Sequence, residues 1–123
     1  KGISAKICHN TLVAQIQNGV NETLCLAQKL GISIDNFADA VAAGGAQNFY
    51  MNAQREKLKN EDWTTAFSME NMDKDINICN AISESLGFEM PGMKTAKAAL
   101  DEGVNRGWAK EDFRKTYLIV KGE

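Results

Sequence analysis

The chain has 123 residues and a formal net charge of −2, with 14 basic and 16 acidic residues interspersed along it. This length is typical of one compact domain with a core of its own. The absence of a basic stripe argues against nucleic acid as a partner. No apolar run is long enough to cross a membrane, and no signal peptide is visible. The three cysteines are far apart and lack metal-ligand spacing, which predicts reduced, buried thiols in a cytoplasmic protein without a metal site.

The first predicted element is a long helix from Gly2 to Leu30, which contains no proline and stops at Gly31. Apolar residues recur along it at every fourth position, and further apolar residues widen this stripe into a broad arc. The members of the stripe are Cys8, Leu12, Ile16, Val20 and Leu24. Such an arc needs cover on more than one side. His9 falls on the arc, and we interpret it as a core or interface histidine because no nucleophile accompanies it.

Two polar residues, Lys6 and Asn10, lie at the edge of this arc. They are four residues apart and therefore side by side on the helix. An amine and an amide in this position are suited to face a substrate. The alternative is that both are solvated, since the margins of amphipathic helices are normally polar.

A short second helix is predicted after Gly31, with Ser33 or Asp35 as its cap and Gly44–Gly45 at its end. The two glycines do not form a phosphate loop, because no strand precedes them and the required spacing is absent. A third helix is expected from about Gln47 to Leu58. A charged run and the loop 63–67 follow it.

The fourth predicted helix runs from about Met69 to Leu86, with Ser68 as its cap. Its apolar face is defined by residues three or four apart, namely Met69, Met72, Ile76, Cys79, Ile82 and Leu86. Asp75 projects from within this apolar stripe, so its carboxylate must be paired, hydrogen-bonded or functional. A buried structural ion pair and a site at which Asp75 faces Lys6 and Asn10 both remain open.

Pro91 separates this helix from a fifth, expected from Gly92 or Met93 to about Arg106. A sixth helix should begin near Lys110–Glu111. The β-branched ending of residues 117–120 also permits an edge strand, although no partner strand is evident. The sequence therefore predicts an all-α domain of about six helices around one long N-terminal helix.

Several spaced motifs resemble the C-terminal domain of the β-hydroxyacid dehydrogenase family, which includes 3-hydroxyisobutyrate dehydrogenase and is related to 6-phosphogluconate dehydrogenase. They are Gly2-x-x-x-Lys6-x-x-x-Asn10, the segment NETLCLAQKLGIS, Phe67 followed by Lys74–Asp75, and the stretch GFEMPGMKTAKAALDEGVNRGWAKEDF. The similarity covers nearly the whole chain and keeps the motifs in order.

The resemblance implies an enzyme that uses NAD or NADP to interconvert a β-hydroxy acid and its semialdehyde or keto acid. It assigns Lys6 as the catalytic lysine and Asn10 and Phe67 as substrate-binding residues. It places Lys74 and Asp75 beside the nicotinamide cofactor. These types suit the chemistry, since a lysine amine can carry a proton while the cofactor brings the hydride.

The chain lacks the glycine-rich G-x-G-x-x-G turn of a dinucleotide-binding fold. Residues 1–123 are therefore expected to be the C-terminal substrate-binding and dimerisation half of a two-domain enzyme, with the cofactor bound mainly by a missing N-terminal Rossmann domain. This half alone should be inactive, and the resemblance implies a homodimer or homotetramer. The alternative is a non-catalytic helical oligomerisation module.

Overall fold

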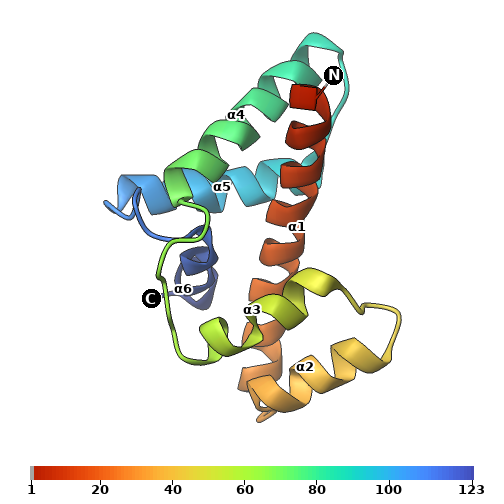
Figure 1. Ribbon diagram of the computed structural model, residues 1–123, viewed down its shortest axis with the longest axis vertical. Helices are drawn as coiled ribbons and strands as arrows, with labels where there is room; N and C mark the ends of the chain where they lie inside the picture. Colours follow the sequence, from red (N-terminus) through yellow and green to blue (C-terminus); the bar gives the residue numbers. More distant parts are fainter. Residues whose placement is uncertain (1) are drawn as a thin grey trace.

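The computed structural model describes residues 2–123 and consists of helices joined by short loops (Figure 1). The elements are α1 (Gly2–Lys29), α2 (Ile34–Ala43), α3 (Phe49–Lys59), α4 (Met69–Ser85), α5 (Pro91–Asn105), the 3-10 helix η1 (Phe113–Lys115) and α6 (Thr116–Lys121). No strand occurs among these residues, and only one isolated antiparallel bridge joins Ser68 to Asp112. The all-α class predicted from the sequence is confirmed.

The local signals read from the sequence mark the helix ends closely. The hydroxyls of Ser33 and Ser68 accept hydrogen bonds from backbone N–H groups in the first turns of α2 and α4. Pro91 opens α5, where its missing N–H costs nothing. The edge-strand alternative for residues 117–120 is wrong: these residues are helical in α6, where the Tyr117 hydroxyl donates to Gln28 Oε1 on α1 at 2.6 Å.

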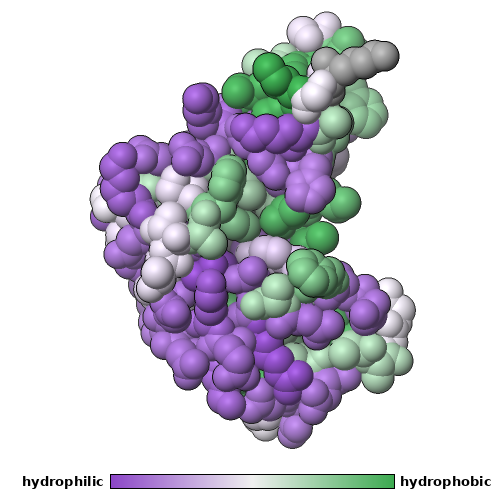
Figure 2. Space-filling view, viewed as in Figure 1, coloured by the Kyte–Doolittle hydropathy of each residue, from purple (hydrophilic) through white to green (hydrophobic). Residues whose placement is uncertain are grey.

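The long helix α1 is the spine of the molecule and contributes to two hydrophobic clusters. Its first half packs against α4 and α5, whereas its second half packs against α2, α3 and α6 (Figure 1). In the same orientation, the surface is hollowed between the end formed by α1 and α4 and the end formed by α2 and α3 (Figure 2).

The buried face of α1 differs from the predicted arc. Val20 and Leu24 are buried as expected, but Cys8 and Leu12 are exposed, Leu12 by 59%. Four residues are slightly more than one helical turn of about 3.6 residues. Residues spaced by four therefore shift gradually around the helix, and over several turns they move from the buried face to the exposed one. The prediction of buried thiols consequently holds for Cys25 and Cys79 and is wrong for Cys8.

Polar residues occupy part of the α1 face that the pattern assigned to apolar side chains. Gln17 and Asn21 are almost fully buried, and the Gln17 amide donates to Asn21 Oδ1 at 2.6 Å. Asn21 in turn donates to the Thr116 hydroxyl at the start of α6, at 3.0 Å. These partners satisfy the buried amides, so burial does not leave unpaired polar groups.

The apolar face of α4 also ends earlier than predicted. Its first four members are buried, but Ile82 and Leu86 are exposed, by 43% and 73%. Phe49 at the start of α3 is likewise 85% exposed. None of the helices in residues 2–123 is both long and apolar enough to cross a membrane.

A carboxyl pair lies between α4 and α5, where Asp73 approaches Asp101. Burial, together with the neighbouring Asp101 carboxyl, raises the pKa of Asp73 to about 7. Asp73 Oδ1 is buried and finds no hydrogen-bond donor among the described residues. A proton on this carboxyl can be shared with Asp101, which explains why the neutral form is favoured.

We expect the free energy of unfolding to fall as the pH rises from about 5 to 8. The pKa of Asp73 in the folded chain lies above that of an unfolded aspartate, about 3.9, so the folded state binds more protons between these values. Asp73→Asn should flatten this dependence in urea denaturation series. Asp39→Asn, which alters an exposed carboxylate, should leave it unchanged. Parallel pH profiles for wild type and Asp73→Asn would contradict the assignment.

Candidate active site

Three polar side chains of the sequence motifs meet beside the first turns of α1. The Asn10 amide donates to Asp75 Oδ2 at 2.8 Å, and Lys6 Nζ lies 3.6 Å from the same oxygen. Asp75 is buried on α4, whereas the Lys6 side chain is 58% exposed. The geometry agrees with the expectation that Asp75 faces the edge of α1 formed by Lys6 and Asn10.

The buried carboxylate determines how its two partners are presented. Asp75 is stabilised by one hydrogen bond and one ion pair, which a buried charge requires. Because Asn10 uses its amide nitrogen toward Asp75, its oxygen points the other way, 3.1 Å from His9 Nδ1. The Lys6 ammonium, at 3.6 Å, keeps donors free for another group on its exposed side.

His9, interpreted from the sequence as a core or interface histidine, does not lie in the core. It is exposed rather than part of the core, and its ring stands beside Asn10. The predicted arc included position 9 because the buried face of α1 was placed too far toward Cys8 and Leu12. The one feature of the sequence that could have indicated a site position for His9 is that it directly precedes Asn10 in the first motif.

Phe67 lies in the loop that precedes α4 and contacts Phe113 edge to face, with ring centroids 6.2 Å apart. Its loop is held by Asp112, whose Oδ2 accepts from the backbone N–H groups of Ala66 and Phe67 at 2.9 and 3.1 Å. Arg114 pairs with the same carboxylate at 2.9 Å, and both side chains are only 1% exposed. The position of Phe67 therefore depends on a buried ion pair contributed by the end of the chain.

Lys74 does not join the cluster of Lys6, Asn10 and Asp75. It is exposed on α4, and no ion pair or side-chain hydrogen bond within residues 2–123 involves it. No group of three or more potential metal ligands occurs in this part of the chain. The structure thus brings together Lys6, Asn10 and Asp75, while Lys74 faces solvent.

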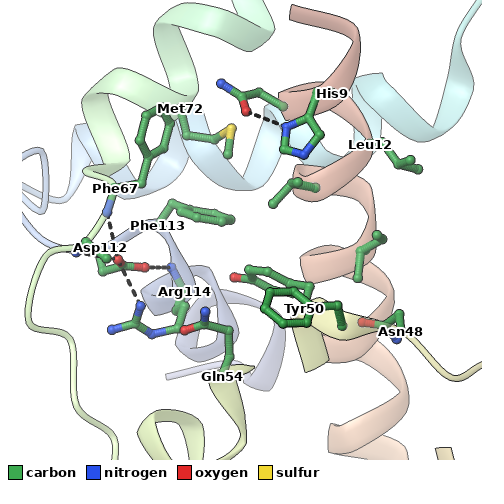
Figure 3. Close-up of a pocket in the computed structure, with 15 residues that line it drawn as sticks. His9, Leu12, Asn48, Tyr50, Gln54, Phe67, Met72, Asp112, Phe113 and Arg114 are labelled. Atoms are coloured by element: carbon green, nitrogen blue, oxygen red, sulfur yellow. Dashed lines mark hydrogen bonds and ion pairs between the residues drawn. The ribbon is translucent and has the colours of Figure 1, made fainter. Parts of the chain in front are cut away.

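A groove of about 450 Å³ adjoins this cluster, and both Asn10 and Phe67 line it. His9, Phe67 and Met72 lie toward one end of the close-up in Figure 3, and Tyr50, Asn48 and Gln54 lie toward the other. We call this cavity the α1–α3 groove. Its lining is largely aliphatic and aromatic, with a few polar groups, which is typical of small-molecule sites.

Comparison with known proteins shows the family of the chain. Residues 1–120 match the protein family described as the NAD-binding domain of NADP-dependent 3-hydroxyisobutyrate dehydrogenase. The chain belongs to this dehydrogenase family. It is 26% identical over 121 residues to L-threonate dehydrogenase of Haemophilus influenzae, covering 98% of this chain and 40% of that protein. It is 24% identical over 120 residues to glyoxylate/succinic semialdehyde reductase 1 of Arabidopsis thaliana, covering 98% and 42%.

Solved structures support the same fold. The 3-hydroxyisobutyrate dehydrogenase of Salmonella typhimurium superimposes with a TM-score of 0.87 at 23% identity, over 94% of this chain and 41% of that one. The Mycobacterium tuberculosis 3-hydroxyisobutyrate dehydrogenase, solved with L-serine, gives 0.85 at 22% identity, over 95% and 42%. The chain therefore spans about two-fifths of the length of the relatives it matches.

Proposed function

We propose that the chain is the C-terminal, substrate-binding half of an NAD(P)-dependent dehydrogenase that interconverts a β-hydroxy acid and its semialdehyde or keto acid. The observation that carries the proposal is the cluster of Lys6, Asn10 and Asp75, of which Asn10 also lines the adjoining, largely apolar groove. Membership of the dehydrogenase family supports the reaction class.

Each member of the cluster has a distinct part in this proposal. Lys6 takes the proton from the substrate hydroxyl during oxidation and returns it during reduction. Asn10 binds the substrate without adding charge, and Asp75 positions both residues from its buried place on α4. Phe67 packs against the substrate from the opposite side of the groove.

The cofactor, NAD or NADP, supplies or accepts the hydride when it is bound. The described helices offer no glycine-rich phosphate-binding turn, so we propose that an N-terminal Rossmann domain binds most of the cofactor. The exposed Lys74, next to Asp75, is available to contact the nicotinamide end.

The proposal is tested by assaying the full-length enzyme with β-hydroxy acids and with NAD or NADP, following nicotinamide absorbance. We expect turnover of at least one acid by the full-length enzyme and none by residues 1–123 alone. Calorimetric titration of residues 1–123 should detect no appreciable binding of either cofactor. Absence of turnover with every acid would overturn the proposal, and tight cofactor binding by this chain alone would place the cofactor site elsewhere.

A second surface of the chain is suited to self-association. For this reason we propose a helical oligomerisation module as the alternative function. Exposed apolar residues gather where α1 begins and α4 ends (Figure 2). They border a groove of about 420 Å³ lined by residues that include Ile7, Cys8, Leu12, Ile82, Leu86 and Phe88. Exposed apolar surface of this kind usually marks a protein partner. We propose that it forms the contact of a homodimer or homotetramer, and that the assembly is cytoplasmic.

Leu86→Glu should shift the full-length protein from oligomer toward monomer in sedimentation at micromolar concentration, because it introduces a charge into this apolar surface. Leu30→Glu is the matched control, since Leu30 is equally exposed but lies at the other end of α1. Leu24, a member of the apolar stripe predicted along the first helix, is fully buried in the chain's own core and is not available to a partner. An unchanged sedimentation profile for Leu86→Glu would show that this surface does not form the contact between subunits.

A further inference from the structure

The α1–α3 groove continues well beyond the residues that the proposed reaction uses. Besides Asn10 and Phe67, its lining includes Val13 and Ile16 of α1 and the first residues of α3. In Figure 3, Asn48 and Tyr50 lie at the end away from Phe67 and Met72. We propose that this extension binds a neutral, apolar substituent of the substrate, so that the preferred substrates are hydroxy acids or semialdehydes with an alkyl or aryl side chain. This inference rests on the proposed function and specifies its substrate class.

One wall of the groove is a row of aromatic rings. Phe113 contacts Phe67 on one side and stacks with Tyr50 on the other, at centroid distances of 6.2 and 6.0 Å. The Tyr50 hydroxyl donates to the buried Gln17 side chain, which fixes the ring and uses up its polar end. Burial raises the pKa of Tyr50 well above its ordinary value, so the phenol stays neutral. This wall is already in place without a ligand and presents ring faces and edges.

The opposite wall is aliphatic. Val13 and Ile16 of α1 both line the groove and are only partly buried, so their side chains have surface to offer to a ligand. The exposed Phe49, at the start of α3, stands at the same cavity. An apolar group placed between the aliphatic and aromatic walls removes apolar surface from water on both sides.

The charge distribution in the groove disfavours anionic substituents. Arg114 lines the groove, but its guanidinium pairs with Asp112 at 2.9 Å and donates to the carbonyls of Asp62 and Thr64. Its charge is therefore balanced before any ligand arrives. The Tyr50 hydroxyl, engaged by Gln17, is the only hydroxyl among the described lining residues. Arg114 Nε has no hydrogen-bond partner within residues 2–123, but the side chain is only 1% exposed, so a phosphate would find no exposed ammonium or guanidinium among the lining residues. The other polar groups along the groove are the amides of Asn10, Asn48 and Gln54 and the ring of His9.

The size of the groove agrees with a substituent larger than a methyl group. Its volume of about 450 Å³ lies within the range of sites that enclose whole ligands. A short hydroxy acid held at Lys6 and Asn10 would leave the extension to water. Each additional buried methylene is worth roughly fourfold in binding.

The test uses the full-length enzyme and compares kcat/KM for 3-hydroxybutyrate and 3-hydroxyoctanoate. We expect the ratio of the longer to the shorter acid to be at least about tenfold. Ile16→Trp, which fills the extension, should bring this ratio close to one, and the milder Ile16→Ala should leave the longer acid preferred. Ile78→Trp is the matched control, because Ile78 is a half-exposed isoleucine of α4 that lines neither groove; it should keep the wild-type ratio.

Equal kcat/KM for both acids in the wild type would overturn the inference, as would a loss in Ile16→Trp that is the same for both. A change in sedimentation with Ile16→Trp and none in the ratio would show that the groove is a contact between subunits, which also overturns it. These outcomes leave the proposed function intact as long as the short acid is turned over. Turnover of neither acid, nor of any other, would instead overturn the proposed function itself.

Discussion

Replacing Lys6 by methionine in the full-length enzyme is expected to lower kcat/KM by about 10²- to 10⁴-fold, the usual contribution of a positioned general acid or base. Methionine keeps the aliphatic length of the side chain but removes the amine that carries the proton. The loss of stability should stay below that of breaking a fully buried pair, because the Lys6 side chain is 58% exposed and Asp75 keeps its hydrogen bond from Asn10.

The matched control is Lys94→Met, which removes an exposed lysine of α5 that is paired with Glu89 at 3.0 Å and is not a member of the cluster. It should change kcat/KM by less than about twofold, since surface pairs contribute little. Asn10→Ala should act mainly through KM, because Asn10 is proposed to bind the substrate and not to move a proton. Wild-type kcat/KM in Lys6→Met would exclude this lysine from the mechanism.

The helix ends could be predicted from the sequence because they are determined by residues close to one another along the chain. Ser33 and Ser68 cap their helices through groups three residues away, and Pro91 starts a helix by its own geometry. Asp75 was informative for a similar reason, because a carboxylate inside an apolar helical stripe requires a partner wherever that partner lies.

The buried face of α1 could not be predicted because different helices cover its two halves. The buried amides Gln17 and Asn21 are satisfied by Tyr50 and Thr116, 33 and 95 residues away along the chain. Helical periodicity carries no information about such distant partners. His9 was misplaced for the same reason, since its exposure depends on which side of α1 is covered.

The α1–α3 groove was equally hidden from pattern analysis. Its aromatic wall combines Phe67, Phe113 and Tyr50, which come from a loop, a 3-10 helix and α3. Of these, only Phe67 was assigned a role from the motifs, although Phe113 ends the closing motif. The same motif contains Asp112, but its function in holding the Phe67 loop emerges only from the tertiary contacts.

Arg114→Met is expected to destabilise residues 1–123 by about 3–5 kcal/mol, the usual cost of removing one partner of a buried ion pair. Asp112 would keep its backbone N–H donors but lose the only cation within reach among the described residues, while remaining fully buried. The carbonyls of Asp62 and Thr64 would also lose their donor. Urea denaturation monitored by circular dichroism measures this loss directly.

Two further variants distinguish the cost of breaking the buried ion pair from the general effect of replacing an arginine. Arg106→Met breaks a partly exposed pair with Glu102 and should cost about 1 kcal/mol or less. The double variant Asp112→Asn with Arg114→Met should be less unstable than the sum of the two single variants, since no buried charge is then left unpaired. Equal, small losses of stability for Arg114→Met and Arg106→Met would contradict this account of the loop.

In the full-length enzyme, at a temperature where Arg114→Met stays folded, the Phe67 loop is no longer held by the buried pair. This variant should raise KM more than it lowers kcat, because the lysine that moves the proton is untouched.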